Sequence, residues 1–207
     1  MAYDLEEQEQ LDEFKAWWKQ NGKMVTSLLI ALLVGYAVFQ GWHFYQNKQA
    51  VEASTQYQEL LVIEEKDLKA IQAKSAKLME SFSGTPYAGR AALFAAKANY
   101  QANEVKSAKA QLDWTINNAK ETAVSALASL QLANILAEEK DFTGALKLLN
   151  APHDAGFDGL FSDLKGDVLV SLGKNAEAKE AYEQALTKLE PKGKFRALTQ
   201  QKLESLG

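Results

Sequence analysis

The side chains that could carry out chemistry are few and lie far apart in the sequence. The chain has two histidines, His43 and His153, and no cysteine. A metal site needs several ligands at short spacing, and a nucleophilic serine needs a histidine base that a third group holds in place. Neither arrangement can be assembled, because His43 falls in an apolar segment and His153 stands alone. The sequence therefore predicts no metal site, no cofactor and no catalytic residues, so we do not expect an enzyme.

Binding of nucleotides or nucleic acids is not predicted either. The Gly173–Lys174 pair lacks the preceding spaced glycine of a phosphate-binding loop. The formal net charge is −4, and residues 1–23 contribute −3 of it through six acids and three lysines. Residues 24–207 are therefore almost neutral. Because DNA and RNA binding depend on a dense positive face, nucleic acid is excluded as an expected partner.

The most distinctive element is the apolar run Met24–Tyr45, whose 22 residues carry no formal charge. About 20 apolar residues span the hydrocarbon core of a bilayer, and a soluble core helix rarely lacks charge on every face for so long. A cleaved signal peptide would have a short basic start and a small-x-small cleavage site. This run instead follows 23 residues rich in acids and ends in bulky residues, so we predict a retained transmembrane helix surrounded by membrane lipid.

The flanks of this run indicate its position and orientation. Trp17 and Trp18 precede it, and Trp42 and Tyr45 close it, as expected for aromatic rings at the two membrane interfaces. Three lysines lie before the run, whereas only Lys48 follows closely. This asymmetry places the N-terminus in the cytoplasm and the large C-terminal part outside.

Small residues recur at four-residue spacing inside the run, at Ser27, Ala31 and Gly35. Such a face allows another membrane helix to approach closely. Glycine and alanine are also common in membrane helices in general, so the pattern has two interpretations, and both stay open.

The rest of the chain has apolar residues at helical spacing and no strand pattern. Gly84 suits the position after a helix, Thr85 an N-cap and Pro86 the first helical residue. One helix is expected to continue from the apolar run through residues 46–63. Further helices are expected at residues 67–82, 86–102, 104–118, 121–139, 141–150, 158–173, 175–190 and 193–206. The predicted fold is all-α, with segments 1–23 (cytoplasmic, amphipathic), 24–45 (transmembrane), 46–85 (juxtamembrane helices) and 86–207 (helical repeats).

The clearest repeat is Gly159–Pro191, which resembles a tetratricopeptide repeat, a helix–turn–helix unit of about 34 residues. Its signature residues are Gly166, Gly173, Ala178, Tyr182 and Ala185. We expect Gly166 and Ala178 to face each other where two helices cross, Gly173 to end the first helix, and Tyr182 to fill the gap to the next repeat.

Two earlier units align with this repeat in degenerate form. Sliding back by 33 and then 37 residues aligns Ala178 with Ala145 and Ala108. The turn glycine is then replaced by Lys140 and by Asn103. Because such units bury their faces on their neighbours, about three are needed for a stable stack.

The whole layout resembles the YfgM family, the ancillary subunits of the SecYEG translocon of Gram-negative bacteria. The resemblance covers nearly the full length and rests on the acidic N-terminus with "LDEFKAWWKQNGK", the single apolar run, Trp42 and "DLKGDVLVSLGKNAEAKEAY". It implies an inner-membrane protein with a periplasmic repeat domain. It also implies three kinds of partner: the SecYEG translocon, the periplasmic chaperone PpiD, and exported unfolded polypeptides passed towards the chaperones.

One feature known from related repeats is missing. Repeats that grip a C-terminal carboxylate use lysine, asparagine and arginine at positions that correspond here to Leu93, Lys97, Gln131, Leu160 and Leu164. That clamp is therefore not expected. Other residues are candidates for lining a groove, although ordinary solvated side chains remain the alternative. These candidates are Lys97, Tyr100, Asn134, Asp163 and Asp167.

The sequence thus predicts a membrane-anchored helical scaffold that acts by binding. The resemblance gives the more specific hypothesis, a translocon accessory that helps to transfer exported proteins to periplasmic chaperones. The alternative is a helical-repeat adaptor of another cell-envelope complex, such as a secretion or division assembly.

Overall fold

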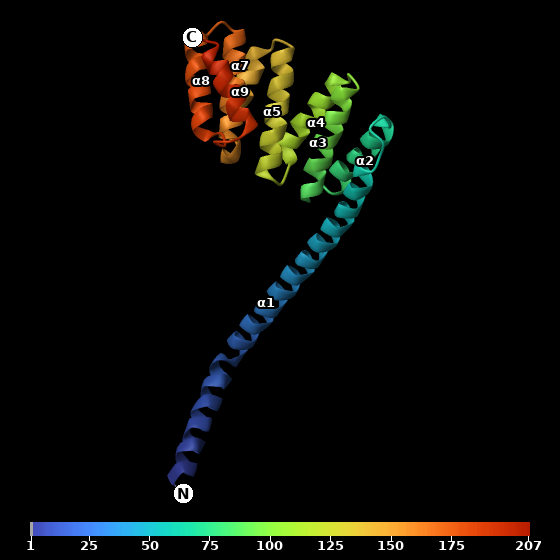
Figure 1. Cartoon of the computed structure of the whole chain (residues 1–207). Coiled ribbons are helices and arrows are strands. Elements are labelled where there is room, and N and C mark those ends of the chain that lie inside the picture. Colours follow the sequence, from blue (N-terminus) through green and yellow to red (C-terminus); the bar gives the residue numbers. More distant parts are fainter. Residues whose placement is uncertain (1) are drawn as a thin grey trace. The chain divides into compact units, whose positions relative to one another are not determined.

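The structure is a computed structural model that describes Ala2–Gly207, with side chains described from Glu6 onward. The described residues form helices and contain no strand (Figure 1), which confirms the predicted all-α class. The elements are α1 (Ala2–Leu61), α2 (Leu68–Ser81), α3 (Pro86–Gln101), α4 (Val105–Asn118), α5 (Thr122–Glu138), α6 (Phe142–Leu149), η1 (Ala155–Phe157), α7 (Asp158–Ser171), α8 (Asn175–Lys188) and α9 (Lys194–Glu204).

The helix boundaries lie close to those expected, with one correction. As predicted, the helix of the apolar run continues without a break, and it ends as α1 at Leu61. Thr85 is the N-cap of α3 and Pro86 its first residue, as predicted. Gly84 is not the residue after the preceding helix, because α2 ends at Ser81 and is capped by Phe82. The Thr85 hydroxyl donates to the Phe82 carbonyl at 2.8 Å instead of capping α3.

The chain divides between Lys48 and Gln49 into two units. In the first unit, the side chains of the apolar run are almost all exposed. Among the described residues, one helix is long and apolar enough to cross a membrane, and it contains this run. So much exposed apolar surface is costly in water and stable in lipid, so the helix fits a membrane anchor. The face with Ser27, Ala31 and Gly35 is uncovered, since a Cβ on Gly35 would meet nothing within 4 Å.

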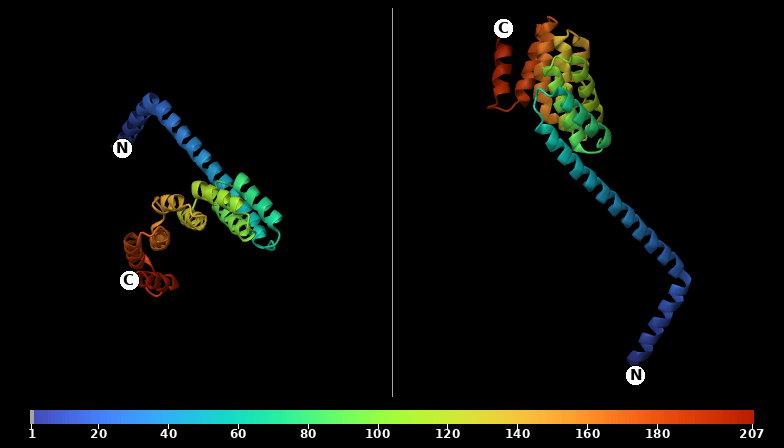
Figure 2. Two further views of the ribbon diagram at one scale, coloured as in Figure 1. Left: turned by 90° about the horizontal axis from the view of Figure 1, so that it is seen from above. Right: turned by 90° about the vertical axis from the view of Figure 1, so that its right-hand side faces the viewer.

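In the second unit, successive helices pack as pairs that stack side by side. The pairs are α3 with α4, α5 with α6 and α7 with α8, and α9 packs on the last pair. The first helices of the pairs, α3, α5 and α7, also contact one another. Figure 2 shows that these helices follow a curved path from α2 to α9. This arrangement gives the stack an inner face lined by α3, α5 and α7.

The turn inside each pair has the same geometry. Asn103, Lys140 and Gly173 have φ values of 63°, 65° and 73°, in the left-handed region. In each turn the next backbone N–H donates to the carbonyl oxygen five residues earlier, at 2.8 to 2.9 Å. Only glycine adopts this conformation without steric cost, and asparagine tolerates it better than most residues. The shared turn aligns three units whose sequences have diverged.

Small side chains occupy the places where the helices approach most closely. Ala108, Ala145 and Ala178 are fully buried at equivalent positions of the second helices. In the last pair, the atom group nearest to Gly166 is the ring of Tyr182, which a Cβ on Gly166 would overlap. Tyr182 therefore packs back onto its own repeat, a contact that the sequence did not indicate, while Lys202 of α9 lies over its ring.

The end of α1 belongs to the core of the second unit. Ala53 and Leu60 are fully buried against residues of α2 and α3, including Ile71 and Leu78. A buried polar contact also joins α2, α3 and α4, because Asn99 accepts a hydrogen bond from Gln72 at 2.6 Å and donates to Gln111 at 2.7 Å. The repeat stack therefore begins on the same helix that contains the apolar run.

The crossing in the last repeat gives the first testable prediction. Gly166→Leu should overpack the contact with Tyr182 and lower the free energy of unfolding by about 1–3 kcal/mol. Glu180→Ala changes an exposed residue of α8 and should stay within about 0.5 kcal/mol of the parent protein. Thermal or urea unfolding of both variants measures the difference. Equal shifts would show that the crossing does not constrain residue 166.

Candidate polypeptide-binding groove

A hollow of about 310 Å³ opens between α3 and α5 on the inner face of the stack. Its lining residues are Ala96, Lys97, Tyr100, Leu112, Leu130, Gln131, Asn134 and Ile135. The floor is apolar, since Ala96, Leu112 and Ile135 are buried and contribute only carbon atoms. Polar side chains stand at the rim. We call this hollow the α3–α5 groove.

The rim is ordered at one end by the carboxylate of Glu138. It accepts a hydrogen bond from the Tyr100 hydroxyl and another from Asn134 Nδ2, the latter at 2.8 Å. The hydrogen bond to Glu138 raises the pKa of Tyr100, so this hydroxyl stays protonated and donating. Asn134 keeps its carbonyl oxygen for another partner, and the Gln131 amide also faces the groove. Such groups can bond a peptide backbone while the floor receives apolar side chains.

Three of the groove residues expected from sequence therefore lie together: Lys97, Tyr100 and Asn134. The other two, Asp163 and Asp167, face α9. Asp163 accepts hydrogen bonds from the buried Thr199 hydroxyl at 2.7 Å and from Lys202 at 2.9 Å. Helix α9 thus covers the end of the inner face that these two carboxylates occupy.

Asp167 joins the same cluster from the other side. It accepts the Tyr182 hydroxyl at 2.8 Å and Lys202 Nζ at 2.6 Å. Burial, reinforced by the hydrogen bond to Asp167, raises the pKa of Tyr182 well above its usual range. Burial lowers the pKa of Lys202, but the two carboxylates outweigh it and leave that pKa raised. The cluster is a structural clamp that holds α9 against α7, with Asp163 mostly buried and Asp167 partly exposed.

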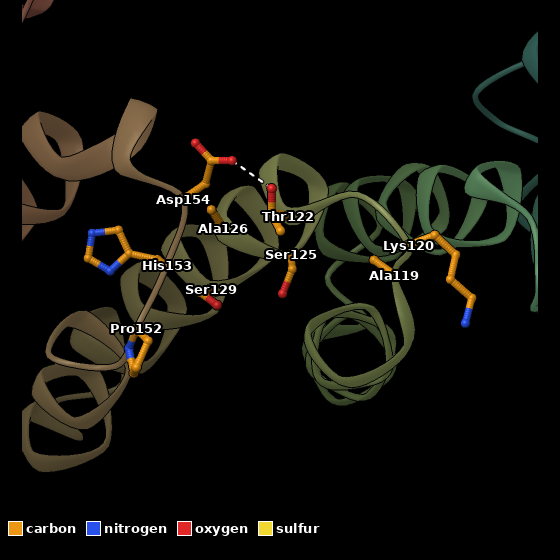
Figure 3. A pocket seen from close by; sticks show the side chains of 9 residues that line it. All are labelled: Ala119, Lys120, Thr122, Ser125, Ala126, Ser129, Pro152, His153 and Asp154. Carbon is orange, nitrogen blue, oxygen red and sulfur yellow. Dashed lines mark hydrogen bonds between the residues drawn. The ribbon is translucent and has the colours of Figure 1, made fainter.

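A second hollow, shown in Figure 3, lies between the α4–α5 turn and the segment that precedes η1. Asp154 accepts hydrogen bonds there from the Thr122 hydroxyl at 2.6 Å and from the Gly156 N–H at 2.9 Å, which together lower its pKa. His153 stacks on Phe161 with ring centroids 3.6 Å apart. These contacts hold the loop in place.

Comparison with known proteins defines the family. A tetratricopeptide repeat-like domain family matches residues 15–207. The ancillary SecYEG translocon subunit of Neisseria gonorrhoeae is 36% identical over the full length of both chains. The chain belongs to the family of ancillary SecYEG translocon subunits. The ancillary SecYEG translocon subunit of Haemophilus influenzae is 29% identical over 89% of this chain and 91% of its own. That of Escherichia coli is 26% identical over 86% and 85%.

Membership of the family fits the chemistry of the site. A tetratricopeptide repeat-like domain is a binding scaffold rather than a type of enzyme. Among the described residues, no three His, Asp or Glu side chains are grouped so that they could hold a metal ion. The polar groups of the α3–α5 groove are amides, a phenol and one lysine, which suit binding.

The sequence did not indicate the floor of the groove. Leu130 and Ile135 lie on α5, which is apolar on several faces because it packs against α4, α6 and α7. A sequence pattern cannot show which of those apolar positions lines the groove. The role of Lys202 and Thr199 was also missed, since their partners are 35 to 39 residues away in the chain.

The clamp on α9 predicts a loss of stability in alkali. The pKa values of Tyr182 and Lys202 are raised in the folded state, whereas unfolded tyrosine and lysine titrate near pH 10 and 10.4. Their contribution is therefore complete below about pH 10 and is lost as the pH rises further. Melting curves between pH 8 and 11 should show this fall. In Tyr182→Phe the melting temperature should fall less steeply with pH. If the slope is the same as in the parent protein, Tyr182 does not contribute to the loss of stability.

Proposed function

We propose that this chain is an accessory subunit of the SecYEG translocon in the bacterial inner membrane. The names of its full-length relatives support this proposal. The single apolar run supports anchoring, and the excess of lysines before it supports a cytoplasmic N-terminus. In this arrangement the repeats lie in the periplasm, where polypeptides leave the translocon.

The α3–α5 groove is the observation that supports a role in handling those polypeptides. Its apolar floor suits side chains that an unfolded polypeptide exposes, and the amides of Gln131 and Asn134 can bond any backbone. No carboxylate clamp is present at the aligned positions, so the groove suits internal segments of a chain rather than its C-terminal end. Lys97 in the lining and Glu138 at the rim carry opposite charges, so selection by charge should be weak.

Transfer to periplasmic chaperones, PpiD among them, completes the proposal. A groove on a membrane-tethered domain meets an emerging polypeptide at high effective concentration. A small open groove holds a short segment weakly, because only a limited apolar area is buried. Weak, brief binding allows a chaperone to take over the polypeptide.

Site-specific crosslinking tests the groove directly. Tyr100 replaced by the photoreactive p-benzoylphenylalanine should crosslink to an arrested exported polypeptide in membranes that contain SecYEG. The same probe at Lys106, an exposed residue of α4 outside the groove, is the control. We expect clearly stronger crosslinks from position 100. Equal yields at both positions, or a contact of position 100 with SecYEG alone, would contradict polypeptide binding in the groove.

Exchange of the anchor tests which part contacts the translocon. Replacing residues 1–45 with an unrelated single-span anchor of the same orientation should weaken co-purification with SecYEG, because the native anchor makes the contact within the membrane. Association with PpiD should remain, since it depends on the repeats. Protease added to spheroplasts should reach the repeats in both proteins. If the repeats are protected, the proposed orientation is wrong.

A further inference from the structure

The part of α1 that precedes the apolar run is amphipathic. Leu11, Phe14 and Trp18 are spaced i, i+3 and i+7, which puts them on one side of the helix. All three are about half exposed, and the ring centroids of Phe14 and Trp18 lie 6.1 Å apart. Glu9 and Glu13 fall on the opposite side. Within the described residues, nothing covers this apolar face.

The helix bends where this segment meets the apolar run. Figure 2 shows a sharp change of direction in the N-terminal, blue part of α1. Three side chains bond backbone carbonyls one turn back at the start of the run: Asn21 to Trp17 at 3.2 Å, Thr26 to Gly22 at 2.7 Å and Ser27 to Lys23 at 2.8 Å. Such side-chain bonds compete with the helical ladder and bend helices. Because of the bend, the axis of the amphipathic segment points in a different direction from the axis of the apolar run.

A notch lies just before the apolar run, where Gly22 has no side chain. Its lining residues are Trp18, Lys19, Gly22, Lys23, Thr26 and Ser27, and its volume is about 530 Å³. The Trp18 indole lies 3.1 Å from the place where a Cβ on Gly22 would stand. The hydroxyls of Thr26 and Ser27 donate hydrogen bonds to backbone carbonyls. In contrast, no carboxylate among the described residues pairs with Lys19 or Lys23. Two free ammonium groups therefore border the notch.

We propose that residues 6–23 form an interfacial helix that binds anionic phospholipid. Its apolar face lies at the boundary between headgroups and acyl chains, and Lys19 and Lys23 hold a lipid phosphate at the Gly22 notch. The continuity of this segment with the apolar run favours lipid over a protein partner. A helix that bends at the end of a membrane span meets headgroups first, and Trp, Phe and Lys are the residues that bind there.

The arrangement fixes the anchor in two ways. A helix lying on the membrane surface resists movement of the span along the membrane normal, because moving it would expose the apolar face to water. The phosphate at the notch also favours one rotation of the span about its own axis, since the two lysines lie on one side. A fixed rotation would present the same face of the span to any neighbouring membrane protein.

Depth measurements on the full-length protein test the proposal. The chain has no cysteine, so single substitutions Leu11→Cys, Phe14→Cys, Glu9→Cys and Glu13→Cys each give one spin-label site. In nanodiscs containing phosphatidylglycerol, the ratio of oxygen to nickel-chelate collision rates should be roughly threefold higher at positions 11 and 14 than at 9 and 13, because interfacial helices bury their apolar face by 5–10 Å. Equal ratios at all four positions would overturn the interfacial helix.

The lysines are tested separately with matched variants. Lys19→Gln with Lys23→Gln should reduce the depth of the label at position 14 in phosphatidylglycerol but not in pure phosphatidylcholine. Lys15→Gln is the control, because Lys15 already pairs with Asp12 at 2.9 Å. If the double variant behaves like the control, the phosphate site is wrong. If positions 11 and 14 become protected only when SecYEG is added, the face binds the translocon and the lipid proposal is overturned.

Discussion

Close contact between helices at small side chains is the constraint on which the repeat domain depends. Alanines at the crossings of α3–α4, α5–α6 and α7–α8 are fully buried, and Gly166 admits the ring of Tyr182 against its own backbone. At such contacts even one added methylene forces the helices apart. The two helices of each pair are thereby held at a fixed distance from each other, and the pairs stack along a curved path (Figure 2). The curvature in turn leaves one face, lined by α3, α5 and α7, available for a ligand.

The α3–α5 groove is a consequence of this stacking. It lies between the first helices of two neighbouring pairs, and Leu112 of α4 forms part of its floor. No residue of the groove has strong chemistry of its own. Its capacity for binding comes from placing apolar carbon beneath amides whose partners are already arranged, as Glu138 arranges Tyr100 and Asn134.

The two ends of the domain are closed in different ways. At the C-terminal end, Thr199 and Lys202 of α9 donate hydrogen bonds to the carboxylates of Asp163 and Asp167. Helix α9 thereby covers the inner face of α7. At the other end, Ala53 and Leu60 of α1 are buried against α2 and α3. A solenoid needs such caps, because its terminal repeats would otherwise expose an apolar face. The cap formed by α1 also lies on the helix that contains the apolar run.

The sequence by itself determined the all-helical class, the membrane-spanning candidate, the joints between helices and the alignment of the three repeats. These features depend on local composition: a run without charge, prolines at joints, and small residues about 34 positions apart. The repeat alignment even anticipated that Asn103 and Lys140 take the place of Gly173, and all three share the left-handed turn.

Only the tertiary structure decided which helix surfaces became a site. Lys97, Tyr100 and Asn134 meet in the α3–α5 groove, whereas Asp163 and Asp167, which look equally exposed in the sequence, are taken by α9. The packing of Tyr182 onto Gly166 within one repeat was likewise not foreseen. The physical reason is that helical periodicity shows which faces are apolar or polar but not which helix covers each face. That depends on contacts between residues 35 or more positions apart, which the curvature of the stack brings together.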